Sequence, residues 1–432
     1  MNLSAERFLH DAQISGRAFG YKSALLPTLS FPHGFTNFSP EDVHQMIDEH
    51  IDAIIRGLLE EPQKQEAAKK ETERLVFQGT DRLECWGEMN QFFLGRGWGD
   101  GFPIVPAVAE KVGQMIERSK RKPDEVISVL APGNGLATVE KIAINAVMAG
   151  CLPEHLPVLI AAVEAISDPK FVLRIVAMST GPHTPMLIIN GPIAKELKIN
   201  CGQAALGPGA QSFANTVIGR ALRLILMNVG HAYVGKLDMD TIGSPNKYSM
   251  VLAENEELSP WEALHVERGF SKNTSTVTAF PVESQRDIAN SKSYKAEHLL
   301  NTFASAAADA GSGSATEWIK EGRRNRDTLV MLCPDHVKII GAQGWTKTDV
   351  REYLYFHARI PWRYLKHGGI SGSDRARPAW KWLYESAPDD LPLPVTAGPE
   401  RIQIIVVGGQ GGGKSSYITG VGESVTREIK RL

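Results

Sequence analysis

The sequence predicts a multi-domain α/β protein, with a helix-rich central domain and a partly parallel α/β domain at its C-terminal end. The chain has 432 residues, which is more than one small core usually organises. Its hydrophobic content of 43% and charged content of 22% are typical of a globular protein. In the last third, apolar runs such as TLVMLCP and RIQIIVV alternate with helix-like segments, as in a partly parallel sheet.

Composition excludes several functional classes. The net charge is −2, so we expect no nucleic-acid partner. No apolar run reaches the roughly 18 residues of a membrane span, and MNLSAERFLHDAQ does not resemble a signal peptide. The four cysteines lie far apart without a CxxC pair. This pattern favours free thiols in the cytoplasm over a disulfide framework.

Residues 1–80 are expected to form an N-terminal appendage. Leu26–Phe31 could be a short strand. Ser39, Pro40 and Asp42 form a strong helix start, with a capping hydroxyl, a proline at the first position and an acid at the third. An apolar stripe continues to Leu58, and the charged segment 63–74 is expected to be a helical linker.

Residues 81–270 are expected to form the central domain and to contain the active site. It begins with two helices separated by the glycine-rich segment RGWGDGFPIVP, whose Asp100 is expected to line a pocket. Thr138 should cap the helix TVEKIAINAVMAG, which carries Lys141 and Asn145 on one side. The strand PMLIINGP ends in a turn that presents Asn190 to a substrate.

The central feature is a helix from Ser212, its expected N-cap, to about Asn228. Gly207 and Gly209 precede it, and a glycine-rich entry into a helix offers N–H groups to an anion. Asn215, Thr216, Gly219, Arg220 and Arg223 share the polar side, whereas Phe213, Val217, Ala221, Leu224 and Ile225 share the apolar side. A surface helix with a solvated polar face is the alternative.

Acidic residues follow this helix. Asp238 and Asp240 alternate as at a strand end and could bind a divalent cation or a lysine such as Lys247, beside Tyr248. Glu254, Glu256 and His265 could add to a metal site or transfer protons, although no HExxH motif is present.

Cys201 is the better candidate for a reactive thiol, because it lies in a loop between Asn200 and Gly202. Cys151 follows the C-terminal end of a helix, where the dipole disfavours a thiolate, so a plain buried cysteine is expected there.

Residues 271–432 are expected to form the C-terminal α/β domain. The strand RIQIIVV leads to GGQGGGKSS, which satisfies the P-loop pattern. Only seventeen residues follow Ser415, too few for the strand that carries a magnesium-binding acid. We therefore expect no ATP hydrolysis, and an anion-binding loop formed by Gly412, Gly413, Lys414 and Ser415.

Several segments together resemble one bacterial family. They are GDGFPIVP, TVEKIAINAVMAGCLPEHLPV, ANTVIGRALRLILMNVG, DMDTIGSPNKYSM, AENEELSPWEALHVERGF and VVGGQGGGKSS. The family comprises large proteins associated with the small UGSC-motif (seleno)proteins, and the resemblance covers roughly residues 80–432. The N-terminal segment is similar to the tail of the small UGSC-type domain, but the redox motif is absent here. The resemblance implies an enzyme subunit whose thiol or selenol comes from a partner chain.

Three functions follow as hypotheses. The first is a subunit of a two-component enzyme with thiol-linked oxidoreductase-type or lyase chemistry on a small anionic organic substrate. Its substrate would contact Asp100, Asn145, Asn190, Asn215, Arg220, Lys247 and Tyr248, and its catalytic residues would be Lys141, Cys201, Glu254 and His265. The second is a metal-dependent lyase or hydrolase using Asp238, Asp240, Glu254, Glu256 and His265. The third is a non-catalytic scaffold. The first requires these residues to meet in one cavity at the central helix.

Overall fold

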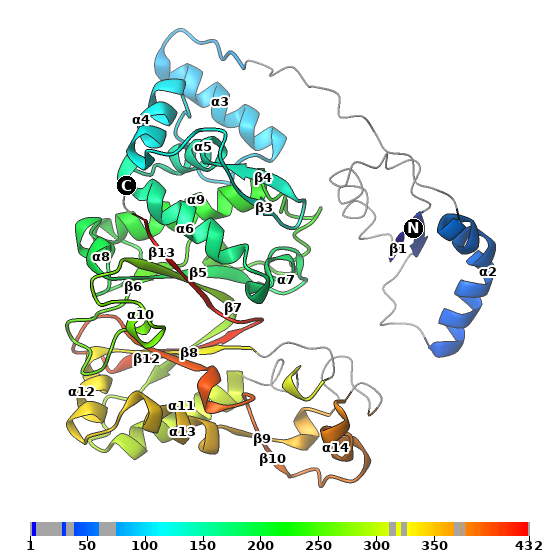
Figure 1. Cartoon of the computed structure of the whole chain (residues 1–432), viewed down its shortest axis with the longest axis vertical. Coiled ribbons are helices and arrows are strands. Elements are labelled where there is room, and N and C mark those ends of the chain that lie inside the picture. Colours follow the sequence, from blue (N-terminus) through cyan, green and yellow to red (C-terminus); the bar gives the residue numbers. More distant parts are fainter. Residues whose placement is uncertain are drawn as a thin grey trace.

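The computed structural model describes residues 2–5, 28–31, 39–59, 75–310, 317–320, 326–366, 373 and 376–430. The N-terminal elements are a parallel pair of strands, β1 (Asn2–Ala5) and β2 (Thr28–Phe31), and the helix α2 (Pro40–Leu59). Figure 1 draws them beside the main body of the chain. The expected linker at 63–74 lies outside the described residues.

A mixed, seven-stranded sheet organises the main body. Its order is β11-β8-β12-β7-β5-β6, and β13 pairs with the first part of β7. The strands are β5 (Thr184–Asn190), β6 (Val251–Ala253), β7 (Thr276–Ala289), β8 (Thr328–Leu332), β11 (Ile402–Val406), β12 (Lys414–Gly420) and β13 (Val425–Glu428).

The sheet consists of two units with the same topology. In the first unit, β5 is parallel to β6 and antiparallel to β7; in the second, β8 is parallel to β11 and antiparallel to β12. The units meet where β7 pairs with β12. One sheet therefore runs through both expected segments, 81–270 and 271–432, and makes the chain an α/β protein.

Helices cover the outer faces of both units (Figure 1). The first unit is packed by α5 (Val139–Ala149), α6 (Leu156–Ile166), α7 (Leu173–Met178) and α9 (Phe213–Asn228). The second is packed by α11 (Ala296–Ala310), α12 (Pro334–Ala342) and α13 (Lys347–His357). Both units place a helix on their third strand, α6 on β7 and α11 on β12. Two separate apolar cores result.

A third core fills the inner face of the sheet, with contributions such as Met186, Phe280, Leu329 and Ile405. The sheet curls around it, so that its two edges approach each other. The Asn255 N–H, just after β6, donates to the Val406 carbonyl at the end of β11 over 2.8 Å. The short helix α10 (Leu264–Glu267) packs against β11 at this junction.

Smaller elements complete the described chain. Before the first unit lie α3 (Arg82–Arg96), α4 (Ala109–Ser119), β3 (Val126–Leu130) and β4 (Gly135–Thr138), and α8 (Pro192–Glu196) follows β5. The second unit adds β9 (Arg359–Pro361), α14 (Trp382–Glu385) and β10 (Pro392–Pro394). Within the described ranges, no helix is both long and apolar enough to cross a bilayer.

Several helix starts follow the capping residues predicted from sequence. Thr138 accepts from the Lys141 N–H, and Ser39 and Asp42 cap each other's backbone N–H groups. Ser212 does not cap α9: its hydroxyl oxygen accepts from Asn200 Nδ2 instead and donates to the Ala204 carbonyl. Phe213, expected on the apolar side of that helix, is 48% exposed, although the adjacent Ala214 and Asn215 are buried.

Candidate functional site

A cavity of about 730 Å³ lies beside α9, between the loop after α3 and the loop 233–248. We call it the α9 cavity. Its lining side chains include four basic residues and one acid: Arg96, Arg223, Lys236, Lys247 and Asp100. The glycine-rich loop expected to line a pocket does so, with Gly97 and Gly99. This volume is within the range of small-molecule sites.

The floor of the α9 cavity is a buried ion-pair network. Asp238 is 2% exposed and accepts from Arg223 Nη2 at 3.0 Å and from Lys247 Nζ at 2.9 Å. Lys247 also lies 2.7 Å from Asp240. Burial raises the pKa of Asp240, but hydrogen bonds from Lys247 and nearby backbone N–H groups outweigh it and lower that pKa. Of the two sequence alternatives for Asp238 and Asp240, the structure has the lysine partner.

Asp100 and Arg220 hold the glycine-rich loop in place. Arg220 donates to both carboxylate oxygens of Asp100, at 2.7 and 2.9 Å, and to the carbonyls of Phe102 and Pro103. All its bonds therefore go to this loop, which it ties to α9. Arg220, expected to bind substrate, instead positions Asp100 at the cavity wall.

The charges around the α9 cavity leave an excess of two positive charges. The lining residues and their ion-pair partners comprise five basic side chains and three acidic ones. Arg96 lies over the rings of Phe92 and Trp98, and Lys236 lies over the ring of Tyr233. These two cations contact aromatic rings rather than acids, so they remain available to an anion.

The mouth of the α9 cavity carries exposed apolar side chains. Phe102 is 49% exposed, Val234 69%, Ile242 95% and Tyr248 46%. The rings of Phe102 and Tyr248 meet edge to face with centroids 4.9 Å apart. Apolar residues gathered around a polar opening are typical of a surface that another molecule covers.

A second polar site, the carboxylate cluster, lies at the other end of β5. It consists of Asn190, Glu254, Glu256, His265, Thr276 and Lys347. Asn190 Nδ2 donates to Glu254 at 2.7 Å and to Glu256 at 3.0 Å. The carboxyl ends of parallel strands are frequent ligand sites in α/β proteins. Four residues named from the sequence, Asn190, Glu254, Glu256 and His265, therefore do lie together.

Several buried atoms of the carboxylate cluster have no hydrogen-bond partner: Asn190 Oδ1, Glu254 Oε1, His265 Nδ1 and Thr276 Oγ1. Lys347 Nζ lies 3.9 Å from Glu254 and 2.8 Å from Glu267. Burial raises the pKa of Glu254 to about 6, although Lys347 opposes this shift. Glu254 thus changes protonation close to neutral pH, as a general acid or base must.

Cys201 adjoins the carboxylate cluster but lacks the features of an activated thiol. Burial raises its pKa, and the nearby Glu256 and Glu257 raise it further. Its carbonyl accepts from the Gly408 N–H of the second unit. An activated nucleophile requires the opposite shift. Cys151 is buried, with its Sγ 3.2 Å from the Val217 carbonyl, as a structural cysteine would be.

The expected single cavity is not formed. Thr184, the first residue of β5, contacts Asn246 near the α9 cavity, whereas Asn190, its last residue, belongs to the carboxylate cluster. At about 3.3 Å per residue, the two sites are roughly 20 Å apart. Asp100, Lys247 and Tyr248 line the α9 cavity, and the remaining expected residues lie elsewhere.

Three of those residues form structural contacts. The exposed Lys141 donates to the Leu136 carbonyl, and Asn145 accepts from Asn228. The buried Asn215 accepts from the Asn200 N–H and donates to the carbonyls of Asn200, Ala205 and Val251. Its polar groups are occupied by backbone, so it bridges the loop before α9 to β6.

The two glycine-rich loops expected to bind anions have different conformations. Gly207 and Gly209 adopt positive φ ahead of α9 and make a sharp turn around Pro208. In GGQGGGKSS, Lys414 and Ser415 begin the strand β12, not a helix, so the P-loop geometry is absent. The N–H groups of Gly411, Gly412 and Gly413 donate to Asp335 at 2.8–3.2 Å. A carboxylate of the chain itself occupies this loop.

The five expected metal ligands divide between the two sites, with Asp238 and Asp240 at the α9 cavity and Glu254, Glu256 and His265 in the carboxylate cluster. Among the residues that the structure describes, no three His, Cys, Asp or Glu side chains are arranged to hold a metal ion. The arrangement therefore gives no support to a five-residue metal centre.

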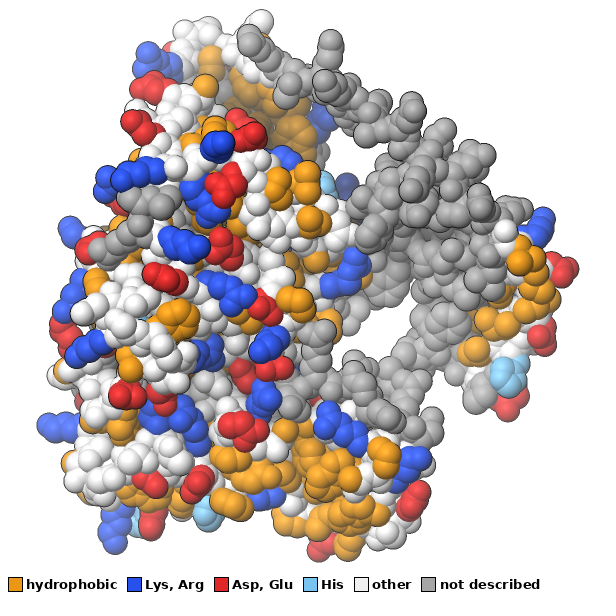
Figure 2. All heavy atoms as spheres, viewed as in Figure 1, with side chains coloured by type: hydrophobic (Ala, Val, Ile, Leu, Met, Phe, Trp, Pro, Cys, Tyr) orange, Lys and Arg blue, Asp and Glu red, His pale blue; other side chains and the backbone are white. Residues whose placement is uncertain are grey.

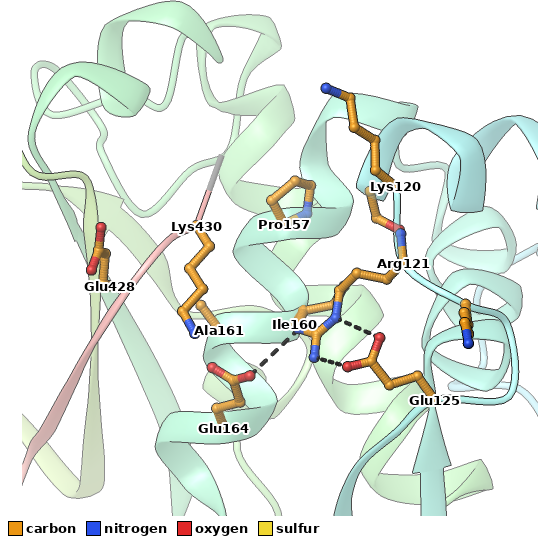
Figure 3. A pocket seen from close by; sticks show the side chains of 11 residues that line it. Lys120, Arg121, Glu125, Pro157, Ile160, Ala161, Glu164, Glu428 and Lys430 are labelled. Atoms are coloured by element: carbon orange, nitrogen blue, oxygen red, sulfur yellow. Dashed lines mark hydrogen bonds and ion pairs between the residues drawn. The ribbon is translucent and has the colours of Figure 1, made fainter. Parts of the chain in front are cut away.

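Another cavity, of about 430 Å³, lies between the end of α4, α6 and β13 (Figure 3). Arg121 reaches across it and pairs with Glu125 and Glu164. Lys430 points into the same space in Figure 3. Because its central cation is already paired with two acids, this cavity serves below as a control site.

Sequence reasoning missed Arg96, Tyr233 and Lys236 in the α9 cavity, and Thr276 and Lys347 in the carboxylate cluster. Arg223 was placed on the polar side of α9, three residues after Arg220, and that spacing was the available signal. Lys347 lies almost a hundred residues from Glu254, so no local pattern relates them.

No family model matches the chain, and comparison with curated proteins and with solved structures finds no significant match.

Proposed function

We propose that this chain is one subunit of a two-component enzyme whose small anionic organic substrate binds in the α9 cavity. The excess of two positive charges around a cavity of about 730 Å³ carries this proposal. Lys247 and Arg223 are held rigidly by Asp238, which suits them to orient a carboxylate or phosphate group. Tyr233 and Tyr248 supply hydroxyl groups on the cavity wall.

The second component would dock on the exposed rim formed by Phe102, Val234, Ile242 and Tyr248. No cysteine is among the described residues that line the α9 cavity. A thiol-linked oxidoreductase or lyase reaction there would need its thiol or selenol from a partner, as the UGSC-family resemblance also implies. We place this assembly in the cytoplasm, since all four cysteines are free.

Binding can be tested with inorganic phosphate and a panel of small mono- and dicarboxylates, by calorimetry at low ionic strength. Lys236→Met and Arg96→Met remove unpaired cations without stranding a buried acid, so each should weaken binding about fivefold, or ~1 kcal/mol. Lys430→Met, at the cavity of Figure 3, should leave the affinity unchanged. Equal affinity in all four proteins would contradict the proposed site.

The partner can be tested by affinity capture from the native host, followed by mass spectrometry. We expect a small thiol or selenol protein in the capture, and its loss with Ile242→Asp, because Ile242 is 95% exposed on the rim. Turnover by the purified chain alone would exclude the two-component model. Unchanged activity of the assembled complex after Lys236→Met and Arg96→Met would favour the scaffold hypothesis.

A further inference from the structure

Three adjacent strands place polar side chains in one row at the carboxylate cluster. Asn190 on β5 lies directly opposite Thr276 on β7, and Glu254 directly follows β6 on the other side of β5. Directly opposite residues of neighbouring strands point to the same face of a sheet, with Cβ atoms about 5 Å apart. The row therefore continues the inner face of the sheet beyond Met186 and Ile188 of the third core.

Each side chain of this row has one buried atom without a hydrogen-bond partner. Asn190 uses its Nδ2 for Glu254 Oε2 and Glu256 Oε1, and its Oδ1 has no partner. Glu254 Oε1 and Thr276 Oγ1 have none either, and neither side chain is exposed. Unpaired buried polar atoms destabilise a fold, so several of them in one place indicate a bound group.

His265, on α10, adds a fourth unpaired atom. Its Nε2 lies 3.5 Å from the Lys272 carbonyl, which can only accept, so the ring proton lies on Nε2 and Nδ1 is an acceptor. Nδ1 is buried without a hydrogen-bond partner, and it lies 4.0 Å from Glu256 Oε1, the same oxygen that accepts from Asn190. The four unpaired atoms therefore gather around Asn190, and each can accept a hydrogen bond.

The carboxylate cluster also carries an unbalanced negative charge. The cluster and the ion pair that continues it comprise three acids and two cations: Glu254, Glu256, Glu267, Lys347 and Arg351. The nearby Lys195 and Glu257 pair with each other. At pH 7.5, above the pKa of about 6 that burial gives Glu254, the cluster therefore has an excess of one negative charge.

Four acceptors and one excess negative charge match a cation that donates four hydrogen bonds, and ammonium is such a cation. Sodium and potassium are hard cations that prefer oxygen ligands, whereas one of the four acceptors is the imidazole nitrogen of His265. Neither cavity described above borders these atoms, so the site takes an ion no larger than water. Glu256, whose side chain is 24% exposed, connects the buried atoms to solvent.

We propose that the carboxylate cluster is a binding site for ammonium, with one N–H donated to each of the four unpaired atoms. The cation would also balance the excess charge of the cluster. A water molecule donates only two hydrogen bonds, so it would leave part of the acceptors unpaired. This inference goes beyond the proposed function and does not depend on it, because the α9 cavity lies at the other end of β5.

The test measures thermal unfolding of the full chain at pH 7.5 in 100 mM ammonium, sodium, potassium or tetramethylammonium chloride. A ligand that binds only the folded chain raises the unfolding midpoint. Tetramethylammonium has no N–H group and is too large for the site, so it gives the reference value. With a dissociation constant of about 1 mM, ammonium should raise the midpoint by about 2 °C above this reference. Sodium and potassium should not.

Thr276→Val removes one acceptor and leaves no other group unpaired. The fold should therefore not weaken in tetramethylammonium, whereas at least half of the ammonium shift should be lost. Thr278→Val is the matched control, because Thr278 lies on the same strand and face but its hydroxyl already bonds to Thr426 Oγ1. Asp309→Asn, at an exposed ion pair with Arg286, is the surface control. Both should keep the full ammonium shift.

A midpoint shift that is specific to ammonium and reduced in Thr276→Val alone would confirm the site. Equal midpoints in ammonium and tetramethylammonium would show that water alone fills the cluster, and would overturn the proposal. An equal rise in sodium or potassium would overturn it as well, as would an ammonium shift that persists in Thr276→Val.

Discussion

The two units of the sheet share a topology but differ in the chemistry at their strand ends. The first unit ends β5 with Asn190, opposite Thr276 on β7, and adds Glu254 after β6. The second follows β8 with Cys333 and places Ser415 and His336 beside it. The shared topology therefore creates an equivalent position in both units, at the ends of β5 and β8. The residue types there determine whether this position contains carboxylates or a thiol.

The units also differ in how their buried charges are balanced. Glu254 of the first unit relies on Lys347, which belongs to α13 of the second unit. In the second unit, in contrast, the buried His336 contacts only uncharged partners in the described chain, Ser415 Oγ and the carbonyl of Asn290, which directly follows β7. The first unit should therefore be more sensitive to substitutions across the junction.

The largest effect is expected for Lys347→Met. It leaves Glu254 and Glu267 without their shared cation, and removing one partner of a buried ion pair costs about 3–5 kcal/mol of the free energy of unfolding. Urea unfolding measures this loss in the free energy of unfolding. Lys195→Met is the matched control, because both side chains of its pair with Glu257 are at least 70% exposed, and it should leave the free energy of unfolding almost unchanged. Equal losses would show that the units are not coupled here.

A smaller effect is expected from pH. The pKa of Glu254 is about 6 in the folded chain and 4.5 without burial, so protonated Glu254 stabilises the fold. This contribution is complete below pH 4.5 and is lost as pH rises through 6. The difference corresponds to about 2 kcal/mol of the free energy of unfolding. Glu254→Gln should remove this pH dependence; parallel stability curves for the two proteins would refute it.

The smallest effect is expected in the second unit, for Asp335→Asn. Burial raises the pKa of Asp335, but the N–H groups of Gly411, Gly412 and Gly413 outweigh it and lower that pKa. Losing the charge should cost about 1 kcal/mol of the free energy of unfolding and speed hydrogen exchange at those glycines. Asp309→Asn should change neither quantity. Unaltered exchange in Asp335→Asn would show that the carboxylate does not hold the loop.

The near balance of acidic and basic residues in the composition predicts no large electrostatic field around the protein. Acidic and basic groups are interspersed over the face drawn in Figure 2. This matches the net charge of −2, so the excess of two cations at the α9 cavity comes from a few neighbouring residues and not from the composition of the chain.

Local features were predictable because they depend on neighbouring residues. The caps at Ser39 and Thr138 and the strands β8 and β11 follow from spacing along the chain. Lys247 could be named as a partner of Asp238 because nine residues separate them in one loop. The prediction of Ser212 as a cap was wrong because its hydroxyl oxygen accepts from the Asn200 side chain, not from a backbone N–H of the helix.

Long-range features depended on the curl of the sheet. Lys347 meets Glu254, and Ser415 meets Cys333, only because the edges β6 and β11 converge and β12 lies beside β8. Amino-acid order alone therefore predicted the α/β class and the helix starts at Ser39 and Thr138. It also named four residues that lie in the carboxylate cluster, Asn190, Glu254, Glu256 and His265. Only the tertiary structure decided that the polar residues form separate sites. The physical reason is that β5, a strand of seven residues, keeps the sites at its two ends apart, whichever side chains lie there.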